Sequence, residues 1–141
     1  MTDPLISSLQ GKLIVSCQAY VGEPMRHPET LAQVAQAVLA GGAAGIRAQG
    51  LADIAAIRAV TDAPLVGLVK EGSEGVVITP TADLALAVLD AGADIVAIDA
   101  TARPRPDGAS FADVLALVRE RRPDAVVMAD VATYDEGVAA E

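Results

Sequence analysis

The sequence predicts an α/β protein built from five successive βα units, and two observations lead to this fold class. First, five short apolar runs each stop at a polar residue, and stretches with apolar residues at helical spacing lie between the runs. Second, the polar residues recur roughly every 25 to 30 positions, which is the size of one βα unit. These residues are Gln18, Arg47, Lys70, Asp99 and Asp130. Because polar groups at the carboxyl ends of parallel strands form the active sites of such proteins, we expect the five side chains to share one site.

The composition fits a single domain, residues 1–141, with a core of aliphatic side chains. The chain has 141 residues, of which 52% are apolar, but only two tyrosines and one phenylalanine supply aromatic rings. A core of Val, Ile, Leu and Ala suits parallel strands that are covered by Ala-rich helices. No linker or low-complexity tract interrupts the chain, so the sequence predicts no domain boundary.

The five apolar runs are predicted strands that lie in a parallel sheet. The third run, PLVGLV, is continuous and apolar, as expected for a strand that is buried on both faces. In chain order, the predicted strands are residues 13–17, 44–46, 64–69, 95–98 and 125–128. Five such strands indicate either an open sheet or a partial (β/α)8 barrel, because a closed barrel needs three more units.

Proline, glycine and capping residues mark the ends of the predicted helices. Pro28 suits the first position of a helix, which Gly41 and Gly42 then end. Capping boxes open two later helices, Ser110 with Asp113 and Thr133 with Glu136. Residues 76–78 read as a short extended piece before a turn at Pro80. Helical spacing predicts buried faces that include Ile54, Ile57, Val60, Leu84, Ala85, Val88, Val114, Leu117 and Val118.

The charge and the cysteine content exclude several classes of protein. A net charge of −9 argues against nucleic acid or an anionic membrane as a partner, because both require a basic surface. The chain shows no basic and apolar leader and no apolar run of membrane-spanning length. Cys17 is the only cysteine, which excludes an intramolecular disulfide and a thiolate zinc site. We therefore expect a cytoplasmic protein without a membrane partner.

Lys70 is the most informative of the five polar residues. It follows the run that reads as a doubly buried strand, and an amine at that point is placed for proton or carbonyl chemistry. The alternative is a solvated lysine at a strand end. Asp99 and Asp130 can equally cap helices or tie loops together, and the Arg103-Pro104-Arg105 segment can bind an anion or bridge carboxylates.

The residues that usually hold metal ions are too few for a metal site. His27 is the only histidine and Cys17 the only cysteine, so no histidine pair exists for a zinc or iron centre. Cys17 lies in a predicted buried strand, where a cysteine usually acts as a small apolar residue rather than a nucleophile. We therefore expect no metal cofactor.

Six segments resemble the N-acetylmannosamine-6-phosphate 2-epimerase family, which consists of (β/α)8 barrels. They occur in the family's order and cover nearly the whole chain. The segments are residues 13–19 (LIVSCQA), 42–48 (GAAGIRA), 64–70 (PLVGLVK), 78–81 (ITPT), 92–101 with Arg103 (GADIVAIDAT, then R) and 128–133 (MADVAT). The resemblance implies that the chain corresponds to roughly the first five βα units of that barrel.

The resemblance also implies a reaction and a set of site residues. The family interconverts N-acetylmannosamine 6-phosphate and N-acetylglucosamine 6-phosphate by moving the proton at C2, so the implied partner is a phosphorylated amino sugar. The residue matching Lys70 is the acid/base. The residues implied or expected to bind the sugar are Gln18, Arg47, Asp130, Asp99 and Arg103.

The family continues through strands six to eight, which carry an assisting glutamate and the glycine-rich loops that hold phosphate. Two interpretations follow: the N-terminal part of an epimerase, or a catalytically inactive remnant or assembly module of the same fold. A pentose-phosphate epimerase of the same shape would need a metal-binding histidine pair. Unpaired strand edges and an apolar inner face lead us to expect an inactive isolated chain that forms a homo-oligomer, such as a dimer.

Overall fold

The computed structural model describes residues 3–141, in which five strands form one sheet. Each strand pairs in parallel with its neighbour, in the order β1-β2-β3-β4-β5. The strands are β1 (Ile14–Cys17), β2 (Gly45–Gln49), β3 (Leu65–Leu68), β4 (Ile95–Asp99) and β5 (Val126–Asp130). Because the spatial order follows the chain order, each unit lies beside the previous one, as in a barrel and unlike a doubly wound sheet, whose order reverses.

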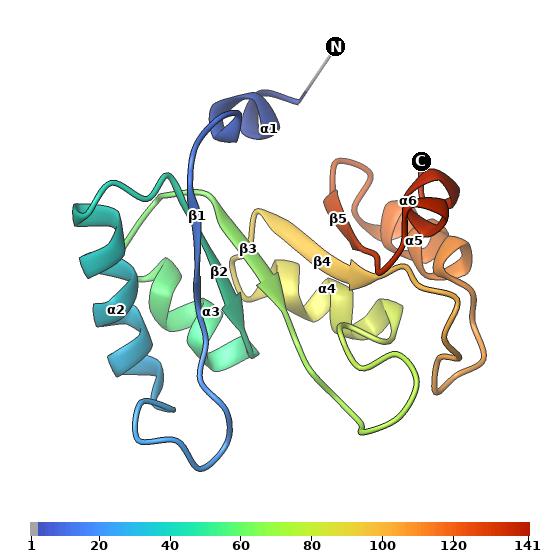
Figure 1. Ribbon diagram of the computed structural model, residues 1–141, viewed down its shortest axis with the longest axis horizontal. Coiled ribbons are helices and arrows are strands. Elements are labelled where there is room, and N and C mark those ends of the chain that lie inside the picture. Colours follow the sequence, from blue (N-terminus) through green and yellow to red (C-terminus); the bar gives the residue numbers. More distant parts are fainter. Residues whose placement is uncertain (1–2) are drawn as a thin grey trace.

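Four helices cover one face of the sheet (Figure 1). They are α2 (Pro28–Ala40), α3 (Leu51–Arg58), α4 (Ala82–Asp90) and α5 (Phe111–Arg121). Each packs against the next, and their apolar faces meet the sheet in the main core. Ile46, Ile54, Val88 and Val96 are fully buried there. None of the helices between residues 3 and 141 has both the length and the apolar character needed to cross a membrane.

The opposite face of the sheet carries a smaller apolar cluster of Val66, Leu68, Ile95 and Ala97. Leu5 and Leu9 of α1 (Pro4–Leu9) pack against this cluster, and Figure 1 shows α1 beside the end of the sheet where the strands begin. Helix α1 was not predicted from the sequence. Its signals are the side chain of Asp3, which accepts a hydrogen bond from the Leu5 amide at 2.7 Å, and Pro4 in the first turn.

The predicted helix boundaries are largely confirmed. Pro28 opens α2, and Gly41 is its C-cap. Ser110 and Thr133 each form the predicted capping box, at the starts of α5 and of α6 (Tyr134–Ala139). Thr81 caps α4 by accepting a hydrogen bond from the Leu84 amide. These caps satisfy amide groups that have no partner inside a helix.

The predicted buried stripes were wrong at two positions. Val60 and Leu117 are 40% and 49% exposed. Helix α3 ends at Arg58, so Val60 lies beyond the last turn and leaves the helical stripe. On α5 only Val114 and Val118 are buried, and Leu117 lies beside them in contact with solvent. The buried face of this helix is therefore narrower than the sequence predicted.

Candidate functional site

The alternation of side chains along each strand decides which polar residues share a face. On β2, Ile46 and Ala48 belong to the helix-covered core, so Arg47 and Gln49 point to the opposite face. We call that face, which carries Val66, Leu68, Ile95 and Ala97, the inner face. The same alternation puts Gln18, Lys70 and Asp99 on the inner face, because their neighbours Cys17, Val69 and Ile98 lie in the helix-covered core. Asp130 lies on the inner face too, because it follows by two positions Met128, which packs on the inner-face cluster.

Arg47 lies in the middle of β2, not after its end as the sequence analysis expected. Its guanidinium crosses the inner face and binds the carboxylate of Asp130 through two hydrogen bonds, at 2.6 and 3.2 Å. The Arg47 Nη1 also lies 3.3 Å from the sulfur of Met128. The two charged side chains are 23% and 25% exposed. This bidentate pair is therefore half-buried, where it is worth more than a solvated surface pair.

Asp99 ends β4 and is 1% exposed. Its carboxylate accepts hydrogen bonds from the Thr101 amide at 2.8 Å and from the Arg103 guanidinium at 2.6 Å. The Arg103 side chain is 54% exposed, so part of its cation faces solvent. Asp99 thus orders its own loop, which was one of the two alternatives left open by the sequence, and presents Arg103 at the carboxyl end of the sheet.

A cavity of about 470 Å³ joins these groups. Its lining includes Arg47, Asp99, Arg103, Asp130 and Ile78. It therefore contains two cations and two carboxylates, all placed at or near strand carboxyl ends. Such a polar cavity can bind and orient a small hydroxylated anion.

Lys70 lies two residues beyond the end of β3 and is exposed. Its Nζ lies 5.1 Å from the centre of the Tyr20 ring, which belongs to the loop after β1. Lys70 also forms an antiparallel bridge with Ile78. Since Ile78 lines the cavity of Arg47 and Asp130, Lys70 lies beside that cavity.

Gln18 lies apart from the charged cavity. Its Nε2 donates to Ser16 Oγ at 2.8 Å, and it lines a second cavity of about 450 Å³ between β1 and α2. Cys17 lines the same cavity. Burial raises the pKa of the Cys17 thiol, which disfavours the thiolate form that a nucleophile requires.

Polar residues around the end of β2 were not among the predicted site residues. Gln49 shares the inner face with Arg47, and its Oε1 is buried without a hydrogen-bond partner among residues 3–141. The backbone carbonyl oxygen of Gln49 accepts a hydrogen bond from Arg26, and Arg26 also forms an ion pair with the buried carboxylate of Asp53. Burial raises the pKa of Asp53, and Arg26 opposes that shift. Counting two residues on from Arg47 would have found Gln49, but nothing local in the sequence links Arg26 to Asp53.

Residues 76–80, which we call the strap, lie between the carboxyl ends of β3 and β4. The two strands pair only at Val66 and Gly67 of β3. Beyond that point the strap hydrogen bonds to the β3 side, with the Thr79 amide donating to Val69 and the Glu71 amide to Val77. On the other side, the Asp99 amide donates to Ile78. The predicted extended piece at 76–78 is therefore an insertion that separates Lys70 from Asp99.

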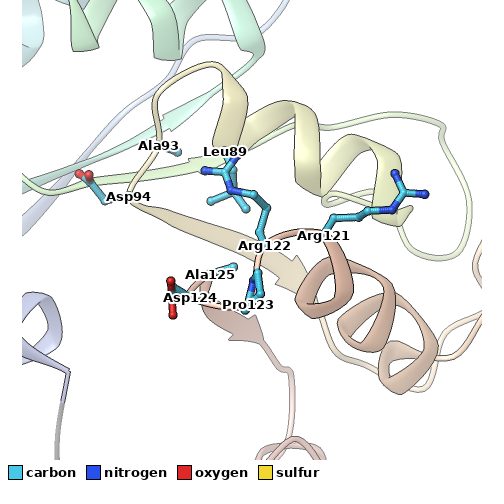
Figure 2. Close-up of a pocket in the computed structure, with 8 residues that line it drawn as sticks. All are labelled: Leu89, Ala93, Asp94, Arg121, Arg122, Pro123, Asp124 and Ala125. Carbon is cyan, nitrogen blue, oxygen red and sulfur yellow. The ribbon is translucent and has the colours of Figure 1, made fainter.

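A third cavity, of about 390 Å³, lies at the opposite end of the sheet, before β5 (Figure 2). Arg121, Arg122, Asp94 and Asp124 are among its lining residues. In barrel enzymes this end of the sheet serves stability rather than chemistry. No group of three or more His, Cys, Asp or Glu side chains that could hold a metal ion occurs between residues 3 and 141.

Comparisons with known proteins identify relatives along nearly the whole chain. Residues 31–141 match the family model described as "Putative N-acetylmannosamine-6-phosphate epimerase". The chain is 53% identical to a Cutibacterium acnes protein described as "Putative N-acetylmannosamine-6-phosphate 2-epimerase", and it covers 59% of the length of that protein. It is 46% identical to one from Caldanaerobacter subterraneus, with the same coverage of 59%. In both cases 97% of this chain is aligned.

The fold is also similar to a solved structure. The N-acetylmannosamine-6-phosphate 2-epimerase of Clostridium perfringens superposes with a TM-score of 0.90 and 34% identity, over 99% of this chain and 61% of that one. The chain thus spans about 60% of the length of these relatives. The five-unit fold and the matches along the chain show that it belongs to the N-acetylmannosamine-6-phosphate epimerase family.

Proposed function

We propose that this protein acts in the epimerisation of N-acetylmannosamine 6-phosphate to N-acetylglucosamine 6-phosphate, with Lys70 as the catalytic residue. The observation that carries the proposal is Lys70, whose backbone pairs with Ile78 at the lining of the cavity that holds the Arg47–Asp130 pair, in a chain whose relatives are described as 2-epimerases of this substrate. The substrate class is a phosphorylated amino sugar. No metal and no organic cofactor is invoked.

The chemistry is a proton transfer at one carbon. In the open-chain sugar the aldehyde at C1 makes the C2 hydrogen acidic, so an amine can remove it and leave a planar enolate. After the enolate turns about its C2–C3 bond, the protonated amine returns the proton to the opposite face, which inverts C2 and regenerates the free amine with no net gain or loss of atoms. Nearby cations stabilise the negative oxygen of the enolate, as an oxyanion hole does. Arg47 is the less exposed of the two cations that line the cavity, with 23% of its side chain exposed against 54% for Arg103.

The remaining candidate residues bind the sugar rather than move protons. Asp130 accepts hydrogen bonds, holds Arg47 in place and can accept from a sugar hydroxyl. Arg103 presents a half-exposed cation on the same cavity, where an anionic group of the substrate can pair with it. Gln18 and Asp99 complete the proposed set, Asp99 by ordering the loop of Arg103.

The test uses the two lysines of the chain, Lys70 and Lys12. Full-length protein is incubated with N-acetylglucosamine 6-phosphate in D₂O, and deuterium at C2 is followed by NMR. Lys70→Ala should slow the exchange by about 10²- to 10⁴-fold, the usual contribution of a general acid/base. Lys12→Ala, at an exposed turn before β1, should leave it unchanged. Normal exchange in the Lys70 variant would sink the assignment.

We also propose a cytoplasmic location and a homo-oligomer, with a dimer as the simplest form. Among the described residues, β1 and β5 each pair with one neighbour only, and unpaired edges favour association. The single cysteine and the phosphorylated sugar substrate are typical of the reducing cytoplasm.

A further inference from the structure

Arg105 is a buried cation without an assigned role. It is 6% exposed, and its Nη1 donates to the carbonyl oxygen of Pro80 at 3.1 Å, while its Nη2 donates to the carbonyl oxygen of Asp99. Burial lowers the pKa of the Arg105 guanidinium, and the carboxylates of Asp99 and Asp107 oppose that shift. Because a buried charge is costly to desolvate, its partners show what it holds together.

One of the two carbonyl groups that Arg105 binds belongs to the strap, and the other belongs to the neighbouring strand β4. Pro80 ends the strap, and Asp99 ends β4. Arg105 therefore connects the last residue of the strap to the last residue of β4. The start of the strap is tied to the same loop, because the Val76 amide donates to the Pro104 carbonyl oxygen at 3.0 Å. Gly75 packs so closely on that carbonyl group that a Cβ would collide with it.

The strap in turn fixes the backbone around Lys70. The Thr79 amide donates to the Val69 carbonyl oxygen at 2.8 Å, and the Glu71 amide donates to the Val77 carbonyl oxygen at 2.9 Å. Thr79 is fully buried and has a φ of 46°, a left-handed conformation that is unfavourable for a β-branched residue. Its hydroxyl accepts from the Val69 amide at 3.3 Å. Such a backbone persists only where the surroundings hold it.

We propose that Arg105 is a positioning residue, which holds the strap between β3 and β4 and so sets the separation between Lys70 and the Asp99 side of the cavity. Removal of the guanidinium releases Pro80 and Asp99, and the strap can then move away from either strand. The catalytic consequence rests on the proposed function, whereas the effect on the strap does not. A shift of about 1 Å in a catalytic group costs on the order of 10²-fold in rate.

Three variants of the full-length protein separate this role from a general loss of stability. Arg105→Met removes the cation, and Arg105→Lys keeps a cation that cannot hold both carbonyl groups in the fork geometry of a guanidinium. Arg58→Met is the matched control. Arg58 also ties loops together, by donating to the carbonyl oxygens of Gly92 and Thr61 at 2.8 and 3.0 Å and to Asp94 at 2.6 Å. It lies at the other end of the sheet, where Figure 2 shows Asp94.

Two measurements are made on each variant that gives a native circular dichroism spectrum. Amide hydrogen exchange reports on the strap at Glu71, Thr79 and Asp99, and steady-state kinetics reports on kcat and KM. Arg105→Met should speed exchange at these amides by at least about 10-fold, because local opening becomes easier. It should lower kcat by on the order of 10²-fold and change KM much less. Arg105→Lys should fall between this variant and the wild type, and Arg58→Met should change neither quantity.

Wild-type exchange at the three amides, or wild-type kcat in a folded Arg105 variant, would overturn the proposal. If Arg105→Met does not fold, Arg105→Lys decides by the same two criteria. If the wild-type protein exchanges no C2 proton, the proposed function fails, and the amide measurement still decides whether Arg105 holds the strap. An equal fall in kcat in Arg58→Met would show that the Arg105 variants lose activity through a general loss of stability. That result would also contradict the proposal.

Discussion

Arg47 and Asp130 form a bidentate ion pair, at 2.6 and 3.2 Å, although 83 residues and two whole strands separate them. Strands β3 and β4 lie between β2 and β5, so in a flat sheet the two side chains could not meet. The curvature of a barrel-like sheet brings them together across the inner face. The long side chain of Arg47 spans the remaining distance.

This pair should be energetically coupled. Arg47→Met and Asp130→Asn should each destabilise the protein by about 1 to 3 kcal/mol, because each leaves a half-buried charge without its partner. The double variant should cost less than the sum, with a coupling energy of about 1 kcal/mol. Urea unfolding of the four proteins measures the coupling. Additive effects would mean that the pair contributes nothing to stability.

Stability should fall on acidification through Glu136. Hydrogen bonds from the Ala132 and Ala102 amides, at 2.9 and 3.1 Å, hold the pKa of the Glu136 carboxyl below its usual 4.5. A group whose pKa is lowered on folding stabilises the native state above its unfolded pKa, and that contribution is lost as the pH falls through the folded value. The Tm should therefore decrease below about pH 4.5, and less steeply in Glu136→Gln. Equal slopes for both proteins would contradict the prediction.

A methyl group at Gly67 should overpack the core. A Cβ there would lie 2.7 Å from Val88 Cγ1 and from Ala93 Cβ, and 2.9 Å from Ile54 Cδ1. Gly67→Ala should therefore destabilise the protein by about 1 to 3 kcal/mol. Gly137→Ala is the control, because the nearest atom to its Cβ would be 3.9 Å away and α6 should gain up to about 1 kcal/mol in helix propensity. Thermal unfolding of the two variants should show shifts of opposite sign.

The 141-residue chain should self-associate. The edges of β1 and β5 offer unpaired backbone groups to a second copy, whereas the inner-face residues Val66, Leu68, Ile95 and Ala97 are buried and do not. Size-exclusion chromatography with light scattering should give a mass above that of the 14.3 kDa chain. A monomer throughout the micromolar range would show that α1 and the helices cover these surfaces sufficiently.

Local sequence patterns were enough to place the strands and most helix ends. Apolar runs identify strands, and proline, glycine and capping boxes identify helix ends, because both depend on contacts within a few residues. The exposed Val60 and Leu117 show the limit of this approach. Helical spacing indicates which residues lie on one stripe, but the width of the buried stripe depends on the neighbouring helix.

The sequence by itself therefore determined that this is a βα-repeat protein that resembles the epimerase family, with Lys70 and four other polar residues at predicted strand ends. Only the tertiary structure decided which of them meet. The pairing of Arg47 with Asp130, the separation of Gln18 from them and the clasp of Arg105 on Pro80 and Asp99 all join segments distant in the chain. Such contacts follow from sheet curvature, side-chain length and the inserted strap, which no local pattern records.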